Sequence, residues 1–397
     1  MRFSVTTFVG TAGCILWAGA GTARADSSTV QTLQGLIDAG YNIYLSGSMG
    51  SAASGYTSGS EGAIAAGGNV YLQNFGAATK STATGGVGLA VGGNLTINSS
   101  SVNGIVDVGG NLAATSAGLG DMNVGGSMSY LNGQLRGSVN VNGNVSVMNA
   151  GISGPVAVGG AASFVNANTP ASIGKPTAYL APVDFAATSA DMAKVSTYLS
   201  AQQTTAGDSF GKNGNGVFVF NSTVAGDNVF NLTAKDLAAF SGSQVLFTST
   251  VAGATDIINI QDSGTLSLPG NFGISYGGTM TDSKVLMNFS NATTLNVDPN
   301  VSYDLSILAP NATINTSGGN ITGSVFAANL MGSEQLNTAN SGGRFSGALP
   351  GAVLYNSAQI SPAPLLPTGS TPLGLAVLGW FRRGQIRRFG KAVFRRG

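Results

Sequence analysis

Apolar residues recur in a fixed frame around a series of glycine pairs in the first half of the chain. The pairs, one of them Asn-Gly, begin at Gly67, Gly92, Gly109, Gly125, Asn142 and Gly159. After a longer first interval the repeat is 16 or 17 residues. Four positions, at −3, −1, +3 and +5 from the first residue of each pair, are apolar or aromatic in every repeat: Ile64, Ala66, Val70, Leu72; Leu89, Val91, Leu95, Ile97; Val106, Val108, Leu112, Ala114; Met122, Val124, Met128, Tyr130; Val139, Val141, Val145, Val147; Val156, Val158, Ala162, Phe164.

This alternation predicts two short strands in each repeat, each with one apolar face. Two such strands cannot bury their apolar faces alone, whereas stacked repeats can, because every strand pairs with its equivalent in the next repeat. The sequence therefore predicts an all-β fold, a β-solenoid with turns of about 17 residues. Val108, Val124, Val141 and Val158 should form one interior column. We expect the glycine pairs to adopt backbone dihedral angles that other residues avoid. A flat sandwich is the alternative, which the constant register of the apolar frame disfavours.

One long α-helix is predicted between residues 183 and 206, packed alongside the solenoid. Its apolar stripe is Phe185, Met192, Val195 and Leu199, with Asp184 as the N-cap and Gly207 at the end. Strand-like segments resume after it and predict a second β block that closes on the first. They are 217–220, 229–232, 244–248, 257–260, 265–268, 285–289 and the turn-like stretch 305–330, in which Ala309 and Ala327 are eighteen residues apart.

The first 25 residues are typical of a secretory signal peptide. Arg2 supplies a short positive region, residues 3–20 are largely apolar, and the sequence Ala-Arg-Ala ends in a small-residue cleavage site. We predict cleavage after Ala25, with Ala23 and Ala25 as processing residues. Cleavage removes Cys14, the single cysteine, so the exported chain would be stabilised without disulfides.

The C-terminal residues 362–397 have the order of a sorting signal. Pro362 and Pro364 precede the mainly apolar run 365–381, and a basic cluster that begins with Arg382 and Arg383 follows. This order is similar to the PEP-CTERM class of signals, which implies contact with the membrane and processing by an exosortase-type membrane peptidase. Pro362, Pro364, Arg382 and Arg383 are the predicted processing residues. A plain tail anchor and a basic segment lying on the membrane surface are the alternatives.

The predicted organisation is a signal peptide (1–25), a solenoid domain (26–361) and a sorting or anchor segment (362–397). Within the domain we expect a first repeat block at 26–167, the helix at 183–206, a second β block at 212–348 and a tether at 349–361.

Four phrases together resemble the choice-of-anchor A domain, over roughly residues 35–348. They are AIAAGGNVYLQNFG (63–76), AVGGNLTINSSSVNGIVDVGGN (90–111), VLMNFSNATTLNV (285–297) and SILAPNATINTSGGNITGSVFAANL (306–330). The resemblance implies an exported bacterial protein of the cell surface or extracellular matrix, held transiently at the membrane by its C-terminus. It brings no catalytic residues.

The composition of the chain excludes several kinds of catalytic and binding site. The 397 residues include no histidine, which excludes Ser-His-Asp triads and His-ligated zinc. Most of the basic residues lie in the two terminal segments, so the body is acidic, which argues against nucleic-acid binding. Asp256 and Asp262 are the nearest candidates for a carboxylate pair, and we interpret them as solvated edge residues. No catalytic, cofactor or metal-binding residues are predicted.

The sequence therefore favours a non-enzymatic surface or matrix protein with an adhesion or biofilm role. The expected partner is an extracellular polymer, a polysaccharide or a collagen-like chain. A polysaccharide-acting β-helix enzyme is one alternative. A protein that binds ice or another crystalline surface is another, suggested by an irregularly spaced group of threonines at positions 293, 294, 313, 316 and 322.

Overall fold

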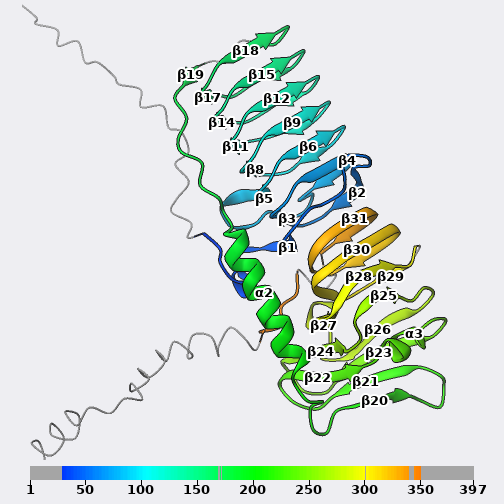
Figure 1. Ribbon diagram of the computed structural model, residues 1–397. Helices are drawn as coiled ribbons and strands as arrows, with labels where there is room; N and C mark the ends of the chain where they lie inside the picture. Colours follow the sequence, from blue (N-terminus) through cyan, green and yellow to red (C-terminus); the bar gives the residue numbers. More distant parts are fainter. Residues whose placement is uncertain (1–28, 169, 171, 300, 339–343, 350–397) are drawn as a thin grey trace, which may run out of the picture. The chain divides into compact units, whose positions relative to one another are not determined.

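The structure, a computed structural model, describes residues 29–168, 170, 172–299, 301–338 and 344–349. Its strands are almost all parallel, and each pairs with the equivalent strand of the neighbouring coils (Figure 1). This arrangement is the predicted β-solenoid. The predicted signal peptide and C-terminal segment lie outside the described residues.

The strands of the first block form three parallel rows. Row 1 comprises β1 (Tyr41–Leu45), β3 (Ala63–Ala66), β5 (Val87–Val91), β8 (Ile105–Val108), β11 (Met122–Val124), β14 (Val139–Val141), β17 (Val156–Val158) and β19 (Ile173–Gly174). Row 2 comprises β4 (Val70–Ala77), β6 (Leu95–Asn98), β9 (Leu112–Thr115), β12 (Met128–Leu131), β15 (Val145–Met148) and β18 (Ala162–Val165). Row 3 comprises β2 (Tyr56–Ser60), β7 (Ser101–Val102), β10 (Gly118–Leu119), β13 (Gln134–Leu135) and β16 (Gly151–Ile152).

The second block continues these rows. Its strands are β22 (Gly226–Leu232), β24 (Ala254–Ile260), β25 (Gly264–Leu268), β27 (Val285–Asn288), β28 (Ala292–Val297), β29 (Ser302–Tyr303), β30 (Ser306–Thr322) and β31 (Val325–Asn337). A smaller sheet contains β20 (Ser209–Lys212), β21 (Phe218–Ser222), β23 (Gln244–Ser249) and β26 (Gly273–Gly278). The helices are α1 (Leu33–Ala39), α2 (Phe185–Ser200) and α3 (Ala234–Ala238), with short 3-10 turns η1 (Thr84–Gly86) and η2 (Asp282–Lys284). The strands predicted after the helix are all present.

The apolar frame forms the interior of the solenoid. Val124 pairs in register with Val108 on one side and Val141 on the other, and Val141 pairs with Val158, which confirms the predicted column. Of the 24 frame positions, all are buried except three in the last repeat. Burial of each such side chain contributes about 1.5–3 kcal/mol, so this frame is the main source of stability.

The glycine pairs have a different role from the one predicted. None of their glycines has a positive φ. They are small because coils approach closely at this corner: a Cβ on Gly109 would lie 2.5 Å from the carbonyl oxygen of Gly92, and one on Gly125 would lie 2.4 Å from that of Gly109. The constraint is therefore steric contact between coils.

The left-handed conformation occurs instead at the corner that follows row 2. One Asn or Ser per coil adopts it, with φ between 48° and 53°: Asn74, Ser99, Ser116, Asn132, Asn149 and Asn166. Asn tolerates this conformation better than other residues with a Cβ, because its short polar side chain can hydrogen-bond locally. The Asn and Ser residues after each second strand thus supply the turn that the glycine pairs were expected to make.

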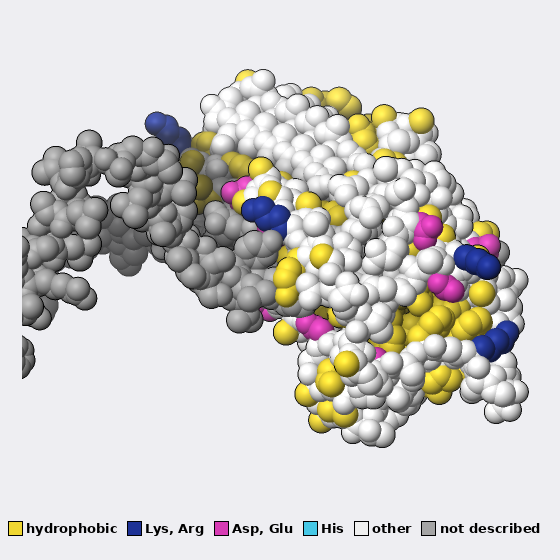
Figure 2. All heavy atoms as spheres, turned by 60° about the horizontal axis from the view of Figure 1, so that its bottom comes forward, with side chains coloured by type: hydrophobic (Ala, Val, Ile, Leu, Met, Phe, Trp, Pro, Cys, Tyr) yellow, Lys and Arg dark blue, Asp and Glu magenta, His cyan; other side chains and the backbone are white. Residues whose placement is uncertain are grey.

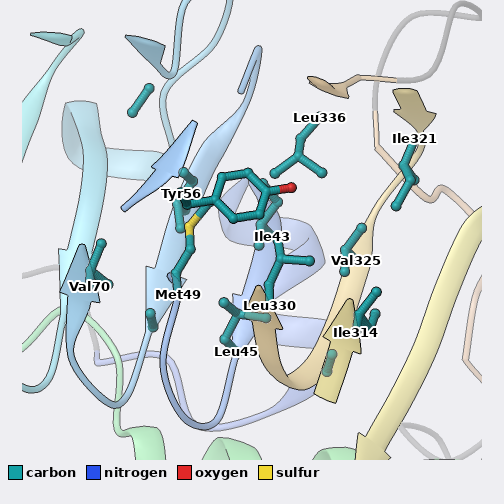
Figure 3. Packing of buried hydrophobic residues seen from close by; sticks show 14 of the residues in the cluster. Ile43, Leu45, Met49, Tyr56, Val70, Ile314, Ile321, Val325, Leu330 and Leu336 are labelled. Atoms are coloured by element: carbon teal, nitrogen blue, oxygen red, sulfur yellow. The ribbon is translucent and has the colours of Figure 1, made fainter. Parts of the chain in front are cut away.

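The two blocks meet at the first coil of the chain. Ile43 on β1 pairs with Val325 of β31 on one side and with Ile64 of β3 on the other. Figure 3 shows the side chains of this junction, with Met49 and Leu330 packed together inside. The described part of the chain therefore enters the stack in its middle at β1, winds to β18, returns along α2 and winds back through the second block, which closes on the first as predicted.

Helix α2 packs on β24, β27 and β30, which continue row 1 into the second block, and Phe185 at its start stacks on Tyr44 of β1. Met192, Val195 and Leu199 of the predicted stripe are buried, and Asp184 caps the N-terminus by accepting from the Ala187 N–H at 3.0 Å. The prediction that the helix continues to residue 206 and ends at Gly207 is wrong, because it ends at Ser200. Asn259 of β24 donates to the Leu199 carbonyl at 2.8 Å, so a side chain of the sheet supplies a hydrogen-bond donor to a carbonyl at the C-terminal end of the helix.

Candidate functional site

A ladder of side-chain hydrogen bonds fixes the corner between rows 1 and 2. The residue after each glycine pair accepts the backbone N–H of its equivalent in the next coil, at 2.8–3.1 Å: Asn69 from Asn94, Asn94 from Asn111, Asn111 from Ser127, Ser127 from Asn144 and Asn144 from Ala161. Ser48 and Asn329 extend this ladder into the second block. These bonds hold the corner rigid along the first block and across its junction with β31, where the Asn329 amide also donates to the Thr313 hydroxyl at 3.2 Å. The amide groups of Asn94, Asn111 and Asn144 each carry two N–H donors.

A trough lies beside this ladder on the outer face of row 2. It has a volume of about 510 Å³ and crosses the four coils of β9, β12, β15 and β18. Its outer row consists of Ala113, Ser129, Ser146 and Ser163, which pair in register and are exposed. One small side chain per coil gives a repeat of about 4.8 Å along the solenoid.

The trough is electrically neutral. Its lining contains only Asn, Ser, Ala and the backbone of inward-facing Leu, Met and Val residues. Charged side chains are also few on the face shown in Figure 2, where most of the surface is uncharged. Such a surface can donate and accept hydrogen bonds, but it has no charge with which to attract an ionic polymer.

A second regular row is made of threonines. Thr265, Thr294 and Thr313 pair in register on β25, β28 and β30, and Asn329 follows on β31. The five threonines proposed from the sequence do not form one array: Thr316 and Thr322 are buried. The regular part includes Thr265, which the sequence analysis missed because coils of the second block are longer and unequal in length.

The two aspartates considered as a carboxylate pair have separate roles. Asp256 is 0% exposed and accepts a hydrogen bond from the Ser222 hydroxyl, so its assignment as a solvated edge residue is wrong. It lies in β24, which is buried along its whole length, and this burial raises the pKa of its carboxyl to about 7. Asp262 accepts from the Ala234 N–H at the start of α3, at 2.5 Å.

A buried glutamate was not singled out from the sequence. Glu334 on β31 is 1% exposed, and neither of its carboxyl oxygens has a hydrogen-bond partner. Burial raises its pKa to about 8. The other glutamate, Glu61, lies 2.5 Å from the Lys80 ammonium. No three acidic or cysteine side chains in the described residues come together as a metal-binding group.

The predicted processing residues Ala23, Ala25, Pro362, Pro364, Arg382 and Arg383 lie outside the described residues. Within the part of the chain that is described, no helix combines the length and hydropathy of a membrane span.

The candidate site is the neutral outer face of row 2 with its threonine continuation. The asparagine after the glycine pairs was the sequence signal for its ladder.

Comparison with known proteins gives one family and one structure. Residues 36–338 match the protein family described as "Putative Ice-binding-like adhesive domain". A solved structure of an ice-binding protein from an Antarctic bacterium Flavobacteriaceae is similar at 12% sequence identity and a TM-score of 0.25, covering 76% of this chain and 96% of that chain. No curated protein matches.

Proposed function

Since the chain belongs to the family of ice-binding-like adhesive domains, we propose that it is a non-enzymatic adhesion protein of a bacterial cell surface or extracellular matrix. The observation that carries this proposal is the neutral trough on row 2, with one small outward side chain per coil. The hydrogen-bond ladder holds the trough rigid, so a ligand would not have to order it on binding.

The proposed ligand is a neutral polysaccharide. Hydroxyl groups of Ser129, Ser146 and Ser163 and amide groups of Asn111 and Asn144 line the trough, and a sugar polymer presents matching donors and acceptors along its length. A collagen-like chain is the less favoured ligand, because the trough offers no aromatic side chain for proline rings.

The experiment measures binding of the purified chain to cellulose, a neutral exopolysaccharide and collagen. Ser146→Tyr fills the trough, and Ser101→Tyr places the same side chain on an exposed position of row 3 as the matched control. We expect the first variant to lose binding by tenfold or more and the second to bind like the unchanged chain. Failure of the unchanged chain to bind any of the three polymers contradicts the proposal.

Ice or crystalline-surface binding is a second candidate, favoured by the row of Thr265, Thr294 and Thr313. Its test is the rate of ice recrystallisation in the presence of the chain, compared with that of Thr294→Lys. If the threonine row binds ice, the unchanged chain slows recrystallisation and the variant does not. If both have no effect, this candidate is rejected and the polysaccharide proposal stands.

We further propose that the chain is exported and is anchored through residues 362–397. The proline motif, the apolar run and the arginine cluster support a PEP-CTERM-like signal read by an exosortase-type peptidase at the membrane, and the phrases quoted above support a choice-of-anchor A protein. Cells that express the chain with and without residues 362–397 are fractionated. The anchored form should remain with the envelope and the shortened form should enter the medium, whereas equal recovery in the medium refutes anchoring.

A further inference from the structure

The first block ends with an uncovered apolar coil. Val158 and Phe164 are partly exposed and Ala162 is exposed, although the equivalent positions of the five preceding coils are all buried. β18 pairs with β15 on one side, and within the described ranges no strand pairs with its other side. β19 covers only Val156 and Ala157 of β17. The end of the stack is therefore an open strand edge above an apolar interior.

Exposed hydrophobic side chains continue from this edge along the flank. Met148 is 42% exposed, Val165 is 44% exposed and Ile173 is 55% exposed. Leu131, Met148 and Val165 pair in register, so they form one row that reaches the open end. Ile173 is exposed separately, on β19 of row 1. A row of neighbouring exposed apolar side chains is typical of an interaction site on a soluble protein.

The open edge lacks the features that keep strand edges apart. Natural edge strands carry lysine, proline or inward-pointing charges that prevent pairing with another molecule. β17, β18 and β19 contain no charged residue and no proline. The edge is therefore compatible with another uncharged strand.

The opposite end of the solenoid is closed. The segment before β20 covers the edge of β22, where the Thr205 hydroxyl accepts from the Val229 N–H at 2.8 Å. β20 covers β21 in the antiparallel direction, and Phe210 packs on Phe220 with ring centroids 4.6 Å apart. Lys212 lies at this end, 5.1 Å from a phenylalanine ring. Among the residues that the structure describes, the solenoid thus has one open end and one closed end.

We propose that the open end binds a second copy of this chain, with the β18 strands of the two copies side by side. The partner's terminal coil has the same apolar positions and the same absence of charge, so it covers Val158, Ala162 and Phe164 while pairing the edge of β18. A two-fold axis makes the two strands antiparallel and keeps their outer faces on the same side. Because each copy has one open end, association stops at a dimer.

The dimer would place two troughs end to end. If the trough binds a polymer as proposed above, the pair gains avidity from two connected sites. The dimer itself rests on the open edge alone, so loss of polymer binding would leave it intact.

The test measures the mass of the full chain in solution by light scattering after gel filtration. Ala162→Asp puts a charge at the open end, on the interior-facing side of β18, and Ala113→Asp puts the same charge on an exposed, outward-facing position of row 2, three coils away. We expect the unchanged chain and Ala113→Asp to have twice the monomer mass and Ala162→Asp to have the monomer mass. A monomeric unchanged chain, or two variants of equal mass, overturns the proposal.

Disulfide crosslinking gives a second readout that does not depend on dimer affinity during gel filtration. In a chain whose Cys14 is changed to Ser, we expect Ser163→Cys to form a covalent dimer under mild oxidation. Ser129→Cys, on the same row two coils away, should remain monomeric on a non-reducing gel. Equal crosslinking of the two variants shows random collision and rejects the interface.

Discussion

Replacing Glu334 by Gln should stabilise the protein at alkaline pH, because the buried carboxyl of Glu334 resists ionisation. Its pKa rises from an ordinary value of 4.5 to about 8, and burial is the cause. The folded chain therefore keeps a proton that the unfolded chain releases between these values. The contribution of Glu334 is fully present below pH 4.5 and is lost as pH rises to 8.

The size of this loss follows from the shift. Each pKa unit corresponds to about 1.4 kcal/mol, so the shift of Glu334 corresponds to about 5 kcal/mol above pH 8. Glu334→Gln removes the titration but buries an amide, which costs about 1–3 kcal/mol if its donors stay unpaired. The variant should be slightly less stable than the unchanged chain at pH 4 and more stable at pH 9.

The assay is urea unfolding followed by far-UV circular dichroism from pH 4 to pH 9. Asp256, which is buried, and Asp227, which is half-buried, also have pKa values raised by desolvation, to about 7 and about 6, but they are present in both chains and cancel in the difference. Burial raises the pKa of Glu61, but hydrogen bonds from Lys80 and Thr338 outweigh it and lower the pKa overall, so Glu61→Gln is the control of opposite sign. Parallel stability curves for Glu334→Gln and the unchanged chain would refute the reasoning.

Three further predictions concern the stability of the solenoid coil that contains Gly109, Asn111 and Leu112. Gly109→Ala should lose about 1–3 kcal/mol, because its Cβ would lie 2.5 Å from a carbonyl oxygen of the coil below, whereas Gly118→Ala, with its nearest neighbour at 4.0 Å, should be close to neutral in the same unfolding assay. Asn111→Ala should lower the unfolding free energy by about 1 kcal/mol, because the Ser127 N–H loses its acceptor, and Ser129→Ala should lower it less. Hydrogen exchange at the Ser127 N–H checks this, and equal protection in both variants contradicts it. Leu112→Ala, at a buried interior position of row 2, should lose about 2–5 kcal/mol of unfolding free energy, and a loss below about 1 kcal/mol would show that the position is not packed as described.

The sequence predicted the solenoid because its signal is local and repeated. Each frame position, such as Val124, has the same neighbours in the next coil, so one period determines many contacts. Strands of the second block were also recognisable from their own apolar alternation. The helix was recognised from its stripe, but its end was not, because Asn259 lies far along the chain and supplies the capping contact.

Other features depend on contacts that no local pattern contains. The position of β1 between the two blocks rests on pairing with β31, nearly 300 residues later. The burial of Glu334 follows from the same junction. The threonine row was missed because Thr265 and Thr294 belong to coils of unequal length, so their register appears only after folding. The role of the glycine pairs was predicted wrongly, because glycine is the expected residue in two situations: where two coils approach closely and where φ is positive. The sequence alone does not distinguish them.

The central claim is that the two blocks form one continuous solenoid with the first coil in the middle. Spin labels at Asn315 and Ser129 test it, in a chain whose Cys14 is changed to Ser. Both residues follow interior positions of row 2, and six strand steps separate them, through Leu330, Met49, Val70, Leu95 and Leu112 to Met128. At about 4.8 Å per step, electron–electron dipolar spectroscopy should give one narrow distance distribution centred at about 29 Å. A broad distribution, or one centred well beyond that distance, would contradict a single stack.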